Sequence, residues 1–171
     1  METKEVLLLL TDDWADWEAS FAVSFINAEE GCVVKTIAVD EKPKVSMGGL
    51  RTEIDYTISR YTNFDNLAMV ILTGGTSWRN NDYQDYPEIR EFVANVRDKD
   101  IPVAAICGAT SYLEKHGFTD HSQPKQVTNE NGFITANGTA ALEFTREILL
   151  TLKVRSDEDV EGWYNYFKNG E

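Results

Sequence analysis

The sequence predicts an α/β domain in which helices cover both faces of a mostly parallel sheet, a doubly wound arrangement. Short apolar runs alternate along the chain with longer amphipathic segments, which is the pattern of strands joined by helical crossovers. Several of the strand-like runs are apolar throughout, as expected for strands that are buried on both faces. The 171 residues are enough for one domain with a sizeable core, and no linker rich in Pro, Gly or Ser divides them. We therefore expect a single domain over residues 1–171.

Five apolar runs are expected to form the central strands. Each is short and ends at polar or glycine residues that are typical of turns. They cover residues 5–10, 32–39, 66–72, 102–106 and 133–136. Between the second and third runs, residues 43–61 contain Gly48, Gly49 and a short alternating pattern, which predicts short hairpin-like strands.

Amphipathic segments with helical spacing follow these strands. The expected helices cover residues 16–30, a segment that starts at Pro87, and residues 110–115, 139–153 and about 157–168. Gly31 supplies a stop for the first helix, Pro87 suits the first turn of the second, and Thr139 is the expected N-cap of the fourth. The last helix has apolar residues at i, i+3, i+4 and i+7, so we expect it to dock on the domain: Val160, Trp163, Tyr164 and Phe167.

Charge and cysteine content exclude several classes of function. Sixteen Lys and Arg against 29 Asp and Glu give a net charge of −13, whereas nucleic acids and anionic membranes attract basic surfaces. The longest apolar runs have five residues and cannot span a bilayer, and no signal-peptide hydrophobic region follows the acidic start. Cys32 and Cys107 are too few for a disulfide framework and lack metal-ligand spacing. We expect a cytoplasmic protein with free thiols, a packed Cys32, and no metal or cofactor.

Three strand ends are candidates for the functional site, because ligands of doubly wound sheets bind beyond the carboxyl ends of the strands. The first strand is followed by Thr-Asp-Asp at 11–13, and the third is followed by Thr-Gly-Gly at 73–75. The fourth strand leads directly into Cys107 and Gly108. We expect these three segments to meet at one edge of the sheet.

The residues around Cys107 fit a nucleophile elbow, a sharp turn from a strand into a helix. Such a turn needs small residues two positions before and after the nucleophile, and Ala105 and Ala109 stand there. At a helix N-terminus, unpaired N–H groups and the helix dipole favour a thiolate. The N–H groups of Gly108 and Gly75 would form an oxyanion hole. The structural alternative is that Cys107 is only a small residue packed in the core. The small neighbours of Cys107 and the Gly-Gly turn favour the functional interpretation.

Five segments, in order, carry a resemblance to a known family: VLLLL, DDWADWEAS, VILTGG, PVAAICGAT and FITANGTAALEF. Together they resemble the ThiJ/PfpI family of the class I glutamine amidotransferase-like superfamily, from about residue 4 to residue 152. The resemblance implies a flavodoxin-like fold and a homodimer. It also implies cysteine-dependent hydrolase, glyoxalase or deglycase chemistry, or a stress response through cysteine oxidation.

The resemblance also implies a role for Glu18, which stands where the family has a glutamate in contact with the nucleophilic cysteine. A carboxyl packed between Trp14, Trp17 and a thiolate would have its pKa raised by desolvation and by the like charge. It could then donate a hydrogen bond to the sulfur or move a proton for the substrate. The structural alternative is a solvated acid on an exposed helix face, which is the usual environment of glutamate.

Further pocket residues are expected on the segments around the strand ends. Gly74 belongs to the Gly-Gly turn, and Asn137 and Gly138 belong to a segment that lies near the site in the resembling family. Trp14 and Trp78 are candidates for apolar walls, with core packing as the alternative for both. The expected ligand is a small molecule.

The sequence departs from the family pattern in two ways. Peptidase-like members have His directly after the cysteine, and glutamine amidotransferases use His and Glu two residues apart; this chain has Gly108 and only two histidines. His116 is expected at a helix C-terminus and His121 in a surface loop, so glutaminase activity is excluded and peptidase activity is disfavoured. Only residues 120–132 fill the place where the family inserts a strand and a loop. Either the site is trimmed and open, or a segment is missing from the sequence.

Two functions remain open. In the first, Cys107 attacks a small aldehyde, glycated adduct, amide or isonitrile while Glu18 relays protons. In the second, the protein is a non-catalytic redox sensor in which Cys107 is oxidised to a sulfinate that Glu18 holds. Only turnover of a substrate separates the two.

Overall fold

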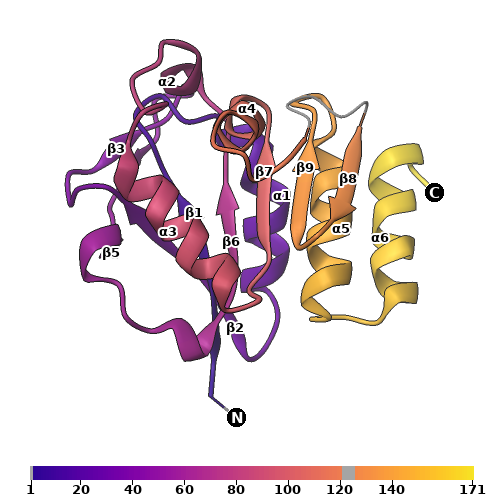
Figure 1. Cartoon of the computed structure of the whole chain (residues 1–171). Helices are drawn as coiled ribbons and strands as arrows, with labels where there is room; N and C mark the ends of the chain where they lie inside the picture. Colours follow the sequence, from indigo (N-terminus) through magenta and orange to yellow (C-terminus); the bar gives the residue numbers. More distant parts are fainter. Residues whose placement is uncertain (1, 121–125) are drawn as a thin grey trace.

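A seven-stranded sheet forms the centre of the molecule (Figure 1). The computed structural model describes residues 2–120 and 126–171. The strands of this sheet are β1 (Lys4–Leu9), β2 (Cys32–Ala38), β5 (Tyr56–Thr57), β6 (Leu67–Leu72), β7 (Val103–Ile106), β8 (Val127–Glu130) and β9 (Phe133–Ala136). Their order in the sheet is β5-β2-β1-β6-β7-β9-β8, and only β8 runs antiparallel to its neighbour. The expected mostly parallel sheet is confirmed.

The strand order creates a switch point between β1 and β6. The chain leaves β1 toward β2 at one side and later returns to the other side of β1 to form β6. Because the two crossovers depart in opposite directions, the carboxyl ends of β1 and β6 leave a crevice between their loops. The functional candidates after Leu9 and Leu72 therefore lie at the place where this architecture binds ligands.

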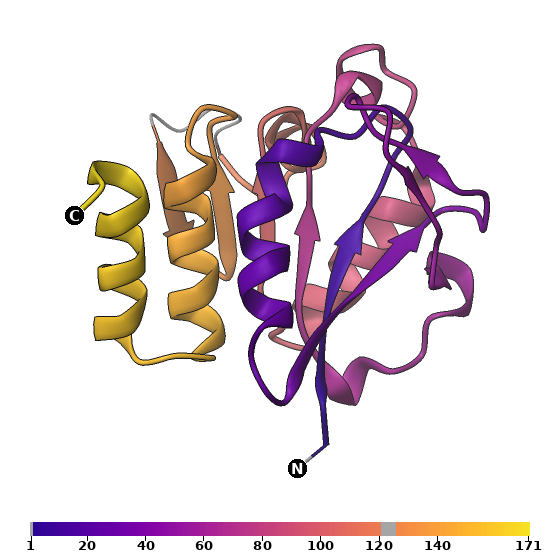
Figure 2. The same cartoon turned by 180° about the vertical axis from the view of Figure 1, so that it is seen from behind.

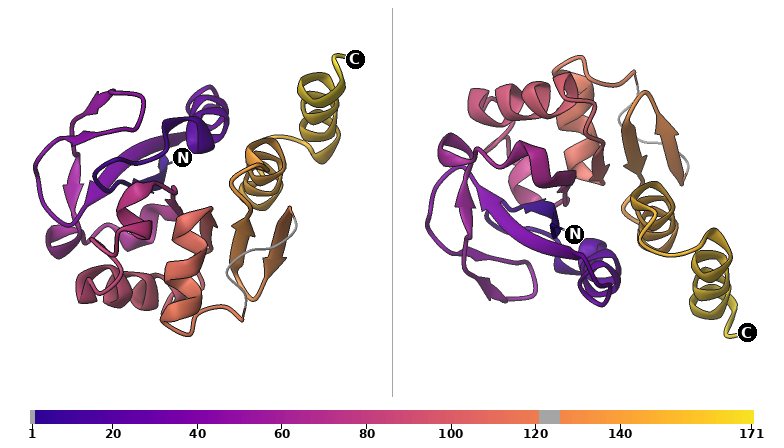
Figure 3. Two further views of the ribbon diagram at one scale, coloured as in Figure 1. Left: turned by 90° about the horizontal axis from the view of Figure 1, so that it is seen from above. Right: turned by 90° about the horizontal axis from the view of Figure 1, so that it is seen from below.

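Helices cover both faces of the sheet, as the sequence predicts. They are α1 (Asp16–Asn27), α5 (Ala141–Leu152) and α6 (Asp157–Asn169) on one face, and α3 (Pro87–Asp98) and α4 (Gly108–Lys115) on the other. Figure 2 presents the first group in front of the sheet, and Figure 3 shows the two layers end-on. Successive residues of β1 alternate between the layers: Leu7 packs with the α3 side and Leu8 with the α1 side. The strand is therefore apolar throughout.

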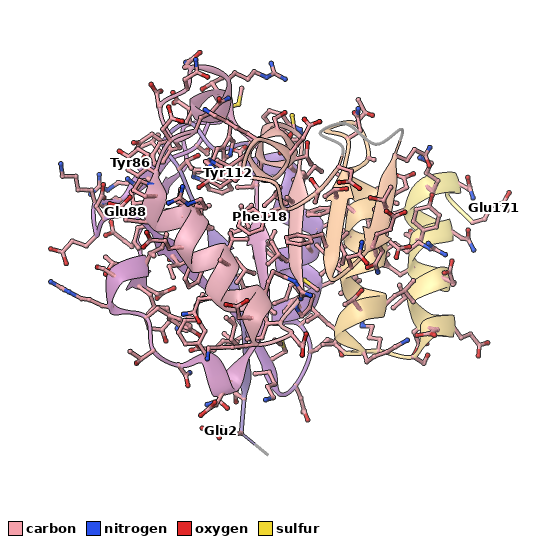
Figure 4. All side chains as sticks on the ribbon, viewed as in Figure 1. Glu2, Tyr86, Glu88, Tyr112, Phe118 and Glu171 are labelled. Carbon is pink, nitrogen blue, oxygen red and sulfur yellow. The ribbon has the colours of Figure 1, made fainter. Side chains whose placement is uncertain are left out.

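Tyr112 secures α4 in the layer that also contains α3. Its side chain is fully buried, and its hydroxyl donates a hydrogen bond to the backbone oxygen of Tyr86 at 2.9 Å. Figure 4 labels both residues in front of the sheet. A buried tyrosine hydroxyl needs such a partner. The bond fixes the helix that begins directly after Cys107.

The C-terminal helix docks as expected. Ser156 caps its N-terminus by accepting a hydrogen bond from the Asp159 N–H, and Val160 and Trp163 are buried. The Trp163 ring packs edge-on against Phe25 of α1, with ring centroids 4.7 Å apart. No helix among residues 2–120 and 126–171 has the length and apolar character that a membrane span needs.

Several local features differ from the sequence prediction. Helix α1 ends at Asn27 rather than at residue 30, so Gly31 is not its direct stop, and α4 begins at Gly108 rather than at residue 110. The segment after α4 contains the strand β8, which was not predicted, and residues 76–79 form a short helix, α2 (Thr76–Arg79). Helix α5 begins at Ala141, so the prediction that Thr139 is its N-cap is wrong. The Thr139 hydroxyl donates to Asn137 Oδ1 instead, at 2.9 Å. That bond keeps the hydroxyl within the preceding turn.

The region between β2 and β6 forms a hairpin, as predicted, and one further strand. β3 (Lys44–Val45) pairs antiparallel with β4 (Arg51–Thr52), and Gly49 occupies the left-handed region in the turn between them. The β5 strand instead joins the main sheet parallel to β2. Trp14 forms bridges to both Ser46 and Gly75, so the hairpin lies beside the loops at the carboxyl edge of the sheet.

Candidate active site

Cys107 occupies a strained turn between β7 and α4. Its backbone has φ 57° and ψ −126°, a conformation that a residue with a side chain rarely adopts. The turn is held on both sides: the Cys107 N–H donates to Ala136 O at 2.9 Å, and its carbonyl accepts from Thr110 N–H at 3.0 Å. Ala105 and Ala109 are completely buried on either side. The backbone thus has the shape of the elbow that the small residues predict, and it leaves the thiol half-buried.

Glu18 brings a buried carboxyl to this turn. It lies in the first turn of α1 and is 2% exposed, although glutamate is rarely buried without a partner. The Gly74 N–H donates to Glu18 Oε2 at 2.8 Å, and the carboxyl is also hydrogen-bonded to the Cys107 thiol. Loops after β1, β6 and β7 therefore meet at one acid–thiol pair.

Burial and mutual repulsion govern the ionisation of this pair. Desolvation raises the pKa of Glu18, although the Gly74 N–H, the thiol and Arg79 act in the opposite direction. Desolvation likewise raises the pKa of Cys107, and the charge and hydrogen bond of Glu18 raise it further. The Gly108 N–H and Arg79 favour the thiolate but do not outweigh these effects. Considering the helix N-terminus alone predicts a readily formed thiolate, and that prediction is wrong because burial, and after it the neighbouring Glu18 carboxylate, raises the pKa of the thiol.

Two glycines, Gly75 and Gly108, lie beside the Cys107 turn. The Gly108 N–H, the first of α4, is hydrogen-bonded to the Cys107 sulfur. Gly75 has φ 152° and lines a cavity together with Cys107, and its antiparallel bridge to Trp14 does not use the Gly75 N–H. A Cβ on Gly75 would overlap the carbonyl oxygen of Asp13, so only glycine fits this turn. The two glycines are neighbours, since a Cβ on Gly108 would be 3.5 Å from Gly75 O, and the oxyanion role of their N–H groups stays a prediction.

Two cavities meet at Cys107. The larger has a volume of about 270 Å³ and is lined by Trp17, Glu18, Arg79, Cys107, Thr110, Ala136, Asn137, Gly138 and Thr139. The smaller, of about 100 Å³, is lined by Ala15, Trp17, Glu18, Met47, Gly75, Thr76, Arg79 and Cys107. Gly138 leaves space above the thiol, because a Cβ at this position would be 2.9 Å from Cys107 Sγ. The predicted positions of Asn137 and Gly138 beside the cysteine agree with this lining.

The aromatic walls differ from the prediction. Trp78 is 1% exposed and donates its indole N–H to Thr73 O at 3.0 Å, and Trp14 is also buried. Neither lines the two cavities at Cys107, because both rings are packed in the core. Trp17 lines both cavities instead and is 50% exposed. Its position next to Glu18 in the sequence was the available signal.

Sequence reasoning missed Arg79. Its Nη2 lies 3.9 Å from Cys107 Sγ, and the residue lines both cavities. The arginine ends the short helix after the Gly-Gly turn, four positions beyond Gly75. A cation placed so soon after a predicted oxyanion-hole loop is a signal that could have identified it.

Other titratable candidates lie outside this pair. His116 caps the C-terminus of α4, as expected, and its Nε2 is 2.7 Å from Gln84 O. Cys32 is buried in β2, and burial raises the pKa of its thiol. The prediction for His121 lies outside the described residues. Within the described part of the chain, no cluster of three His, Cys, Asp or Glu side chains could hold a metal ion.

Known proteins share both the sequence pattern and this fold. The DJ-1/PfpI family model matches residues 4–124. Uncharacterized protease YdeA of Bacillus subtilis (strain 168) is 35% identical over 182 residues, covering 92% of this chain and 88% of that protein. Uncharacterized protease YoaZ of the same organism is 26% identical, covering 98% of this chain and 92% of that protein.

A solved structure extends the similarity to three dimensions. The ThiJ/PfpI family protein from Bacillus anthracis superposes with a TM-score of 0.84 at 25% identity, covering 100% of this chain and 93% of that one. This is the family that the five sequence segments resemble, so the predicted resemblance is confirmed. The chain belongs to the DJ-1/PfpI family.

Proposed function

We propose that this protein is an enzyme in which Cys107 attacks a small carbonyl or amide substrate and Glu18 relays the proton. One observation carries the proposal: a buried carboxyl is hydrogen-bonded to a half-buried thiol on a strained turn, and a cavity opens onto both. Such strain and burial cost stability, and both are typical of reacting groups.

The raised pKa of Glu18 suits a carboxyl that first accepts a proton as a base and later donates it as an acid. In the resting pair, the carboxylate of Glu18 accepts the thiol proton of Cys107. As the substrate arrives, the proton moves to Glu18, the sulfur lone pair forms an S–C bond, and the carbonyl π pair moves onto oxygen. The N–H groups of Gly75 and Gly108 stabilise that oxyanion.

The second half of the reaction depends on the substrate. With a 2-oxoaldehyde, Glu18 returns the proton to the oxyanion and a hemithioacetal forms. A proton then leaves the sulfur-bearing carbon and is returned to the neighbouring carbonyl carbon, which converts the hemithioacetal into the thioester of a 2-hydroxy acid. With an amide, the oxyanion re-forms the C=O bond while Glu18 gives the proton to nitrogen, so the C–N bond breaks, an amine leaves and a thioester remains on Cys107. Water then hydrolyses the thioester on Cys107, which regenerates the thiol. Each route balances without a cofactor.

The cavity volume of about 270 Å³ favours a small substrate, since pockets for drug-sized ligands start at roughly 300 Å³. Two relatives are named uncharacterized proteases. Peptidase activity is not favoured for this chain, because Gly108 follows the cysteine where peptidase-like relatives have His. Glyoxalase, deglycase or amidase-type chemistry suits the pair better.

Redox sensing is the second candidate. Cys107 is half-buried, and its sulfur lies 3.9 Å from the Arg79 guanidinium. It also faces the Glu18 carboxyl, whose raised pKa favours the protonated form that can donate a hydrogen bond. Two peroxide molecules, each transferring one oxygen and leaving as an alcohol or water, would oxidise the thiol through a sulfenate to a sulfinate that these groups stabilise. A sensor would lack turnover, whereas an enzyme would lose turnover on oxidation.

Turnover with a panel of small 2-oxoaldehydes, glycated amines and amides tests the proposal. We expect activity in the wild type and in Cys32→Ser, a drop of about a hundredfold or more in Glu18→Gln, and none in Cys107→Ser. Undiminished turnover in Cys107→Ser would refute the enzyme proposal. Absence of turnover together with stable sulfinate formation would support the sensor instead.

A further inference from the structure

We infer that Arg79 selects substrates that carry a carboxylate on, or one carbon away from, the carbon that Cys107 attacks. The inference rests on the proposed function and narrows its substrate class to small carboxylated carbonyl compounds. The observations that carry it are the position of the guanidinium, its lack of an ion-pair partner and the surroundings of the two cavities.

Arg79 is positioned for contact with a group bound to the sulfur. Its Nη2 donates to Cys107 Sγ at 3.9 Å, so a group bound to the sulfur comes within reach of the guanidinium, whose charge-assisted N–H···O contacts are about 2.8 Å long. A carboxylate next to an S-bound carbon has an oxygen between the sulfur and the guanidinium. The two donors of the guanidinium match the two oxygens of a carboxylate.

The guanidinium is available for this role. Among the described residues, no carboxylate forms an ion pair with Arg79. Five other arginines each pair with a carboxylate: Arg51, Arg60, Arg90, Arg146 and Arg155. Arg97 also lacks an ion pair among the described residues, but its guanidinium donates to the backbone oxygens of Ile101 and Asn131, whereas that of Arg79 faces the sulfur and the two cavities. A substrate anion would supply the missing partner.

No bond-making step of the proposed reaction uses this cation directly. Gly75 and Gly108 hold the oxyanion and Glu18 moves the proton, while Arg79 acts on the resting pair by favouring the thiolate. The net charge of −13 repels anionic ligands from the surface, so an anionic substrate requires a local cation at the site. Trp17 lines both cavities and offers an apolar surface for the remaining substrate atoms.

Paired alkylating reagents test the inference without a known substrate. Iodoacetate and iodoacetamide react in the same way: the Cys107 thiolate forms an S–CH₂ bond and iodide leaves. They differ in the anionic group, so the ratio of their rates cancels any effect of Arg79 on the thiolate population. The measurement uses a Cys32→Ser background, in which Cys107 is the remaining thiol.

We expect Arg79→Gln to lower the iodoacetate-to-iodoacetamide rate ratio by about tenfold, the usual effect of losing one charge-assisted contact. Arg79→Lys should retain part of the preference. Arg60→Gln is the matched control, since it removes the same charge from another exposed arginine that lines neither cavity, and it should leave the ratio unchanged.

The outcomes separate this inference from the proposed function. An equal slowing of both reagents in Arg79→Gln would mean that Arg79 acts on the sulfur alone, and it would overturn the inference while leaving Cys107 reactive. An unchanged ratio would overturn it as well. A wild-type Cys107 that resists both reagents would overturn the proposed function and the inference together.

Discussion

Replacing Gly138 by alanine should obstruct the space over the Cys107 sulfur. The new Cβ would lie 2.9 Å from Cys107 Sγ, 3.1 Å from Cys107 Cβ and 3.3 Å from Glu18 Oε1. The sulfur can rotate away, but the Cβ of Cys107 is held by the strained backbone of the turn. The φ of Gly138 is outside the left-handed region, so the substitution acts through crowding rather than backbone strain.

The expected cost combines overpacking with a blocked approach. Inserting a methyl group into a packed site costs about 1–3 kcal/mol, and we expect the lower half of that range because one face of the site is open. The alkylation rate of Cys107 should fall at least about tenfold, which corresponds to roughly 1.4 kcal/mol in the barrier. Urea unfolding and timed alkylation followed by intact-protein mass measure the two effects.

Gly162→Ala is the matched control for this variant. Gly162 lies inside α6, and a Cβ there would meet no atom within 4 Å. The control should therefore gain about 0.5–1 kcal/mol in unfolding free energy and keep the wild-type alkylation rate. If Gly138→Ala matched Gly162→Ala in both measurements, the described geometry above the sulfur would be refuted.

Three further substitutions probe the site and the core. Gly75→Ala should cost about 3 kcal/mol or more by urea unfolding, because the Cβ overlaps Asp13 O at φ 152°, and wild-type stability would contradict the turn geometry. Glu18 has a folded-state pKa above its unfolded value, so its burial costs stability as pH rises from the unfolded value through the folded one. The unfolding free energy of Glu18→Gln relative to wild type should therefore increase between pH 4 and 8, and a flat difference would count against the buried carboxyl. Phe144→Ala should lose about 3–5 kcal/mol in thermal or urea unfolding, since the ring is fully buried, and a loss below about 1 kcal/mol would contradict its place in the core.

The fold was largely predictable because its central strands are apolar and short. Residues 133–136 were predicted with the observed bounds, and the other central strands within one residue at each end. The strand β8 was not predicted because its sequence, VTNE, is mostly polar. The strand lies half-exposed at the edge of the sheet. Its pairing with β9 comes from tertiary contact rather than from any pattern of its own.

The site was predictable where its geometry is local in sequence. The elbow at Cys107 needs small neighbours, and those are visible in Ala105 and Ala109. The contact between Arg79 and Cys107 joins residues 28 positions apart, so the place of Arg79 after the Gly-Gly turn marks it as a candidate without reporting the contact itself. The orientation of Trp14 toward the core is likewise decided by packing against elements distant in sequence.

The ionisation of the thiol was predicted in the wrong direction for a similar reason. A helix N-terminus favours a thiolate, and the sequence makes that effect visible at Gly108. The rise in the thiol pKa comes from the burial of the site and from the nearby Glu18 carboxyl, and both are properties of the folded chain. The pair therefore has to be treated as one unit that shares a proton.

The alkylation rate of Cys107 as a function of pH, with and without Glu18→Gln on a Cys32→Ser background, tests the shared proton most directly. Cys107→Ser supplies the blank. With Glu18 present, we expect the thiol to titrate above its ordinary pKa, since burial and the carboxylate both raise it. Glu18→Gln should move the titration to lower pH. A titration that stays in place, or moves to higher pH, would contradict a carboxylate that competes with Cys107 for its proton.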